Sequence, residues 1–331
     1  MLRSPVVAGR FYAGTAEALA SDVALCKKEG AAVAAAVPPG SEQPVAVMLP
    51  HAGHVYCGRV IGATLSGVRL PRLLVLLCPN HTGRGTPLSV WPGGAWRTPL
   101  GDVPCDDAFI ASLTARAPFA ADSLAHMGEH SLEVLLPFLQ CLPGTESVIV
   151  PVCVGTAQPA VLRAAGVVLA ELLAGRDDAA FVVSSDMNHY EPEKVTCIKD
   201  RAALDRVLAL DPDGLLDIVA RHGITMCGAA PMALALYALH ALHDASGRPL
   251  PQAEARHPVL PQDILPEAGV VLVDLRQGVE PPPRNVFSGI FDELVPPVIG
   301  GILALISAHG IVTPEFVEIA AVRPRVVENA V

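Results

Sequence analysis

Histidine and carboxylate side chains follow three predicted buried strands, each where an apolar run stops. The run VAVML ends just before His51, and the run LLVLLC ends just before His81. A third run, AFVVS, is followed by Asp186 and His189. In open α/β sheets, ligands bind outside the carboxyl ends of the strands. Imidazoles and a carboxylate gathered there from distant parts of the chain predict a metal site or an acid/base site.

Two further residues are candidates for the same site. Cys227 stands at the start of the predicted helix 228–243, where the helix dipole favours a thiolate. The alternative is that Cys227 is a small buried hydrophobic residue. His130 opens the predicted helix 130–141 and is interpreted as a pocket residue, whereas His126 is expected on the surface. A lone histidine after a strand is more often a loop residue, so the argument depends on several occurring together.

Apolar runs that alternate with helix-like segments predict a three-layer α/β fold, with helices on both faces of a mostly parallel or mixed sheet. The runs are continuous, as in strands covered on both faces. The predicted strands are 45–49, 73–78, 147–154, 180–184 and 269–275. The predicted helices are 16–28, 57–67, 106–115, 130–141, 158–174, 200–210, 212–222 and 228–243.

Composition narrows the function classes. The net charge of −10, without a basic run, gives no attraction to nucleic acid or to an anionic membrane. The N-terminus lacks the apolar region of a signal peptide, and scattered cysteines are typical of a reducing compartment, so a cytoplasmic protein is expected.

Proline-rich stretches favour one main domain at 1–278 and an extension at 279–331, either helical or poorly ordered. The sequence has no P-loop, GxGxxG or GxSxG motif, which argues against a dinucleotide-dependent enzyme and an α/β-hydrolase.

Seven short motifs occur in an order that resembles the MEMO family, whose bacterial members are called AmmeMemoRadiSam system protein B. The resemblance covers roughly residues 4 to 243. The motifs are SPVVAGRFYAG, PHAGHVYCG, PNHTG, WRTPLGDV, EHSLEVLLPFLQ, SSDMNHY and CGAAP. Three positions depart from the family pattern: His54 replaces an aromatic residue, Cys57 a serine, and Leu135 a glutamine.

The resemblance implies a fold similar to the class III (LigB-type) extradiol dioxygenases, which hold Fe(II) with two histidines and a carboxylate. In this family the matching pocket has two histidines and a cysteine. Carried onto this chain, these metal ligands are His51, His81 and Cys227. Asp186, His189 and His130 match the pocket acid and imidazoles and are the expected catalytic residues. Fe(II) is the favoured metal, with copper or zinc as alternatives because thiolate is a soft ligand.

Two kinds of function remain open at this point. The first is a metal-dependent oxidoreductase, in which His189 acts as acid or base and Asp186 orients it. The second is a non-catalytic module that binds a peptide, a phosphorylated residue or a protein, with a vestigial metal site. The resemblance also implies a radical SAM protein and an AMMECR1-type protein as partners, and a small molecule or peptide in the pocket.

Overall fold

An eight-stranded mixed sheet forms the centre of the fold in the computed structural model, which describes residues 1–34, 44–142, 146–247, 249–255 and 270–273. Its middle is a parallel ladder of four strands, in the spatial order β2, β9, β3, β8. These strands are β2 (Pro44–Leu49), β9 (Ala179–Ser184), β3 (Leu73–Pro79) and β8 (Val148–Val154). The strands predicted from the continuous apolar runs are therefore confirmed.

Shorter strands continue the sheet on both sides. Antiparallel β11 (Val270–Val273) pairs with β2, and β10 (Gln252–Ala255) pairs with β11. At the other side, β4 (Leu88–Val90) runs antiparallel to β8 and pairs with β7 (Ala120–Ala121). A separate three-stranded sheet has the order β1, β5, β6. Its strands are β1 (Leu2–Arg3), β5 (Ala95–Thr98) and β6 (Gly101–Pro104).

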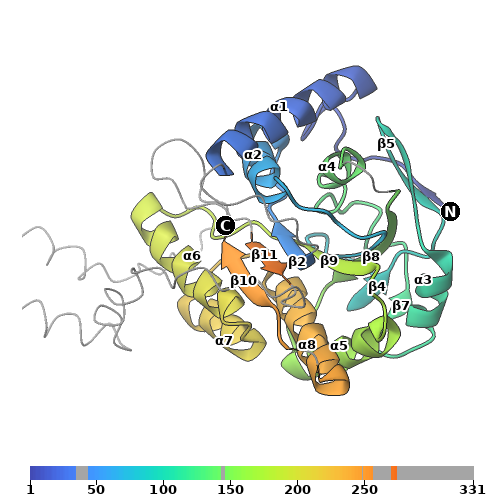
Figure 1. Ribbon diagram of the computed structural model, residues 1–331, viewed down its shortest axis with the longest axis vertical. Helices are drawn as coiled ribbons and strands as arrows, with labels where there is room; N and C mark the ends of the chain where they lie inside the picture. Colours follow the sequence, from blue (N-terminus) through green and yellow to red (C-terminus); the bar gives the residue numbers. More distant parts are fainter. Residues whose placement is uncertain (35–43, 143–145, 248, 256–269, 274–331) are drawn as a thin grey trace, which may run out of the picture. The chain divides into compact units, whose positions relative to one another are not determined.

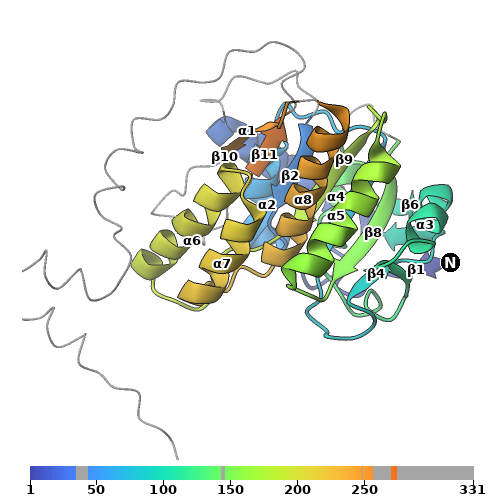
Figure 2. The ribbon, with the colours of Figure 1, turned by 90° about the horizontal axis from the view of Figure 1, so that it is seen from below.

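Helices cover both faces of the large sheet, so the predicted three-layer arrangement is confirmed (Figures 1 and 2). One layer contains α1 (Ala16–Ala34), α2 (His54–Thr64) and the short α4 (Leu136–Gln140). The opposite layer contains α3 (Asp107–Thr114), α5 (Pro159–Leu173), α6 (Glu193–Leu208), α7 (Pro212–His222) and α8 (Ala229–Ser246).

Successive side chains of each central strand enter different cores, which explains the continuous apolar runs. In β3, Val75 and Leu77 pack against the layer of α5 and α8, whereas Leu74 and Leu76 pack against the layer of α1 and α2. All four side chains are fully buried. Alternation places neighbours on opposite faces, and here both faces are apolar because both are covered.

Local signals explain where some helices begin and end. The Asp211 side chain accepts a hydrogen bond from the backbone N–H of Gly214 and caps α7. The helix ends at Gly223, whose φ of 55° lies in the left-handed region that glycine adopts easily. The predicted helix 212–222 is therefore confirmed at both ends.

The predicted helix 130–141 is wrong over most of its length, because only Leu136–Gln140 is helical. Pro137 has no N–H to donate and therefore fits only the first turn of a helix, where it stands in α4. Residues 131–135 form turns instead. This irregular stretch carries much of the candidate site.

Several sequence-based expectations concern the C-terminal part of the chain. Of the predicted strand 269–275, residues 270–273 form β11. The predicted boundary at 278 and the extension 279–331 lie outside the described residues. Within the described part, no helix is long and apolar enough to cross a membrane.

Candidate metal centre

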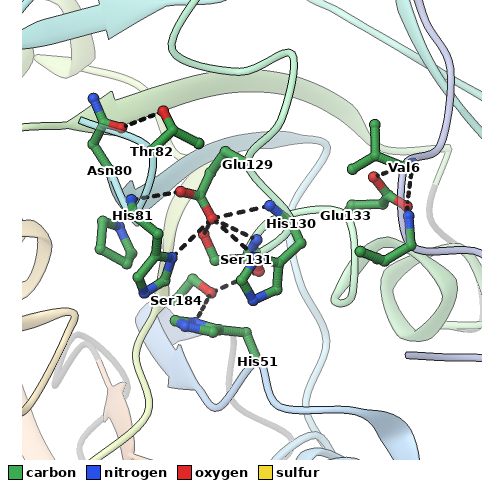
Figure 3. Close-up of polar contacts among 12 residues, drawn as sticks. Val6, His51, Asn80, His81, Thr82, Glu129, His130, Ser131, Glu133 and Ser184 are labelled. Atoms are coloured by element: carbon green, nitrogen blue, oxygen red, sulfur yellow. Dashed lines mark hydrogen bonds and ion pairs between the residues drawn. The ribbon is translucent and has the colours of Figure 1, made fainter. Parts of the chain in front are cut away.

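Three histidines from distant parts of the chain meet at the carboxyl ends of the parallel strands. They are His51 after β2, His81 after β3, and His130 in the turns before α4. One ring nitrogen from each lies within 4.8 Å of the others. Figure 3 shows the three rings around Glu129 and Ser184. Three nitrogens bound to one side of a metal ion at about 2.1 Å lie roughly 3.0–3.4 Å apart, so the longest separation in this group would have to shorten by about 1.5 Å on binding.

The ring of His51 is held in one tautomer by Ser184 at the end of β9. Ser184 Oγ donates its only proton to the carbonyl of Ser131, at 2.7 Å. It must therefore accept from the Nδ1–H of His51, which is also 2.7 Å away (Figure 3). Burial lowers the pKa of His51 to about 4, against the opposing charge of Asp186. His51 is thus neutral at pH 7, with the lone pair of Nε2 available to a metal.

His81 is held in the same tautomer by the carboxylate of Glu129. Its Nδ1–H donates to Glu129 Oε1 at 3.0 Å, and its backbone N–H donates to Oε2 at 2.7 Å. The hydrogen bond with Glu129 raises the pKa of His81, and burial opposes it. A carboxylate behind a histidine is the usual arrangement around metal ions, because it fixes the ring and makes the other nitrogen more basic.

Glu129 is almost completely buried, with 1% exposed, and accepts hydrogen bonds from several groups of the centre. Besides His81, it accepts hydrogen bonds from the backbone N–H groups of His130 and Ser131 and from the hydroxyl of Ser131 (Figure 3). Burial raises the pKa of Glu129, but the hydrogen bonds and charge of its partners outweigh burial and lower it to about 2. The carboxylate is therefore ionised at neutral pH and adds negative charge beside the histidines.

His130 is held mainly by ring contacts. Its ring stacks on His81 with a centroid distance of 5.2 Å and makes an edge contact with Phe11 at a centroid distance of 4.8 Å. Burial lowers the pKa of His130, with Glu129 opposing. His130, predicted as a catalytic pocket residue, thus lies where it could also be a third ligand.

Cys227 lies next to this group at the start of α8. Its Sγ is 3.3 Å from Nε2 of His51 and accepts a hydrogen bond from the backbone N–H of Asp186 at 3.2 Å. The helix dipole does not dominate here, because burial and the charge of Asp186 raise the pKa of the thiol to about 12. The predicted role of Cys227 as a ligand, together with His51 and His81, stays a prediction that the contact with His51 permits.

Asp186 and His189 extend the site beyond the three histidines. Asp186 Oδ1 accepts the backbone N–H groups of His51 and Ala52. Asp186 Oδ2 lies 3.9 Å from Nε2 of both His51 and His189. The Nδ1–H of His189 donates to the carbonyl of Thr225 at 2.9 Å. Thr225 therefore orients His189, whereas Asp186 fixes the backbone after β2 and links the two imidazoles.

The remaining conspicuous histidines lie outside the group. Nε2 of His54 donates to the carbonyl of Val134 at 2.9 Å, and the ring packs against Tyr12 and Phe138. The surface position expected for His126 is wrong, because that side chain is completely buried and contacts Trp91.

Sequence reasoning missed Glu129 and Ser184 as site residues. Glu129 belongs to the EHS motif and precedes His130, so a carboxylate beside a histidine was the available signal. Ser184 is the last residue of β9 and points at His51 only because β2 and β9 are neighbours. That second contact depends on strand order, which the sequence alone did not specify.

The fold and site define an α/β protein with an imidazole cluster at the carboxyl ends of its parallel strands. The Memo-like protein family model matches residues 3–259. A MEMO1 family protein of Ignicoccus hospitalis is 39% identical over 248 residues, covering 72% of this chain and 86% of the relative. The family protein of Methanopyrus kandleri is 36% identical over 261 residues, covering 76% and 92%. The one from Thermotoga maritima is 36% identical over 236 residues, covering 69% and 85%.

This chain therefore belongs to the Memo-like (MEMO1) family.

Proposed function

We propose that this chain binds a divalent metal ion at the three-histidine group and acts as a metal-dependent oxidoreductase on a small molecule. One observation carries the proposal: His51, His81 and His130 place ring nitrogens within 4.8 Å of one another. Ser184 and Glu129 support it, because they hold two of the rings through Nδ1 and leave Nε2 as the nitrogen that can bind a metal. Three imidazoles occupy one side of an ion and leave other positions open.

The donor set restricts the choice of metal. Imidazole suits iron, copper and zinc, whereas magnesium and calcium prefer oxygen ligands. Fe(II) is the proposed ion, because the family resemblance extends to extradiol dioxygenases. Cys227 would add a soft thiolate only after losing a proton that burial holds tightly. If Cys227 replaces His130 as the third ligand, zinc or Cu(I) becomes the better match.

The other residues of the site would bind and orient a small-molecule ligand and would transfer protons. A bound metal would supply Lewis acidity or electron transfer to a small-molecule ligand. His189 is the proposed acid/base, because Thr225 occupies Nδ1 and leaves Nε2 able to take up or release a proton. Its side chain is 31% exposed, so that proton can reach solvent or a substrate. Asp186 keeps His51 and His189 in a fixed relation through its two oxygens.

Metal content measured by mass spectrometry on anaerobically purified protein tests the proposal. We expect near-stoichiometric iron in the wild type, its loss in His81→Ala, and its retention in His222→Ala, which changes an exposed histidine in α7. Retention in Cys227→Ala with loss in His130→Ala would assign the third ligand to His130. A wild type without iron, copper or zinc would refute metal binding and favour the module that binds a peptide or a phosphorylated residue.

We further propose, on the family resemblance alone, that the chain acts with a radical SAM protein and an AMMECR1-type protein, and we place it in the cytoplasm because its scattered cysteines are typical of a reducing compartment. Co-purification of the three full-length proteins after joint expression tests this. Migration of each protein by itself in size-exclusion chromatography would count against a stable complex.

A further inference from the structure

Arg3 is buried beneath the candidate metal centre, where it hydrogen-bonds to the turns that carry Glu129 and His130. Its side chain is 1% exposed. Nε donates to the carbonyl of His126 at 2.9 Å, and a terminal nitrogen donates to the carbonyl of Glu129. The other terminal nitrogen donates to the carboxylate of Glu133 at 2.7 Å. The planar fork of a guanidinium can hold three such acceptors at fixed angles, which lysine cannot do.

Glu133 completes this arrangement by attaching the N-terminal segment to the same turns. Its fully buried carboxylate accepts the backbone N–H groups of Val6 and Val7 at 2.9 Å and the hydroxyl of Tyr12 at 2.7 Å. Figure 3 shows Glu133 between Val6 and the segment that leads back to Glu129. All three nitrogens of the guanidinium and both oxygens of the carboxylate are hydrogen-bonded, as burial of charge requires.

The turns need such support because they have no regular structure of their own. Between His126 and Leu135 the backbone belongs to no helix or strand. The ring of His130 is held by stacking rather than by a strong hydrogen bond, since its nearest charged partner, Glu129, lies 3.5 Å from Nδ1. Its position therefore follows the backbone that Arg3 holds at two carbonyls.

We propose that Arg3 and Glu133 are positioning residues of the metal centre, which set its affinity by holding the turns 126–134 in the metal-binding arrangement. The inference depends on the proposed function, since it concerns the affinity of that same centre. It makes the first residues of the chain part of the centre, although none of them supplies a ligand.

The test compares Zn²⁺ affinity, by chelator competition, in the wild type and in variants of the full chain. Arg3→Lys keeps the charge but not the fork. The double variant Arg3→Met with Glu133→Gln removes both charges together, so no unpaired charge remains buried. We expect affinity to fall about 10- to 100-fold in the double variant, the range for outer residues of metal sites, and by less in Arg3→Lys.

A matched control separates positioning from general loss of stability. Leu169→Ala creates a cavity in the core on the opposite face of the sheet, where Leu169 is completely buried. We expect it to lower the unfolding midpoint and to leave Zn²⁺ affinity within about twofold of the wild type. Wild-type affinity in both Arg3 variants, or an equal loss in Leu169→Ala, would overturn the inference. A wild type that does not bind Zn²⁺ would overturn the proposed function, and this inference with it.

Discussion

Two groups of histidines in this protein differ in where their hydrogen bonds go. In the metal centre, His51 and His81 use Nδ1 to bond Ser184 and Glu129 and keep Nε2 uncommitted to the backbone. His54 and His126 instead direct Nε2 to backbone carbonyls, those of Val134 and Ser89. A carboxylate behind a ring is common among metal ligands, whereas the remaining ring nitrogen of His54 and of His126, Nδ1, is buried without a hydrogen-bond partner among the described residues. Burial alone separates them poorly, since His51 is as enclosed as His54.

The largest difference is expected between two variants, one that loses a metal-binding histidine and one that loses a structural histidine. We expect His81→Ala to weaken Zn²⁺ binding more than about 100-fold, because outer residues alone account for 10- to 100-fold. His54→Phe keeps an aromatic ring against Tyr12 and Phe138 and should bind Zn²⁺ as the wild type does. Isothermal titration calorimetry measures both, and equal losses would contradict the division into two groups.

A smaller effect is expected when the carboxylate behind a ligand is changed. Glu129→Gln should lower Zn²⁺ affinity about 10- to 100-fold, because the amide is neutral and cannot accept all the hydrogen bonds of the carboxylate. Glu171→Gln is the matched control, since Glu171 pairs with Arg116 on the surface. Chelator competition measures the affinities. Unchanged affinity in Glu129→Gln would show that His81 needs no partner.

The free energy of unfolding should show the reverse order, with a larger loss for a structural histidine than for a metal ligand. His54→Ala removes a buried ring and leaves the carbonyl of Val134 without its partner, so we expect a loss of about 2–4 kcal/mol. His130→Ala should cost less than about 1 kcal/mol in the metal-free protein, because that partly exposed ring has weaker contacts. Urea unfolding of both metal-free variants measures the difference. A larger loss in His130→Ala would mean that this ring is structural.

Two buried carboxylates also differ in their hydrogen-bond partners, and this difference predicts how the stability of the protein depends on pH. Glu129 has several donors, whereas Asp200 has one, the backbone N–H of Asn188, and its Oδ2 has no partner among the described residues. Burial raises the pKa of Asp200 to about 7. Between about pH 4 and pH 7 the folded protein keeps a proton that the unfolded chain releases, so this group makes stability fall as pH rises.

Asp200→Asn should remove that part of the pH dependence. Relative to the wild type, we expect the variant to gain roughly 2 kcal/mol of unfolding free energy between pH 5 and pH 8. Urea unfolding at both pH values measures the gain. A constant difference between the two proteins would show that Asp200 titrates as it does in the unfolded chain.

Much of the central fold could be predicted because its signal is local. Continuous apolar runs indicate strands covered on both faces, and the first polar residues after them gave His51, His81, Asp186 and His189. The short strands β4 to β7 carry no such run and were missed. Glu129 and Ser184 act across strands and turns, so their roles follow from tertiary neighbours. His126 was misplaced because a polar residue in an irregular stretch resembles a surface loop until Trp91 and Trp96 enclose it.

The pairing of β11 with β2 has a consequence for solubility. The strand that leads to His51 has ladder partners on both sides, β9 on one and β11 on the other. The family match ends at residue 259, before β11 begins at Val270. A chain cut at the end of the match would leave the peptide groups of β2 unpaired along one side. An open strand of this kind is a template for self-association, so β11 protects the sheet against aggregation next to the metal centre.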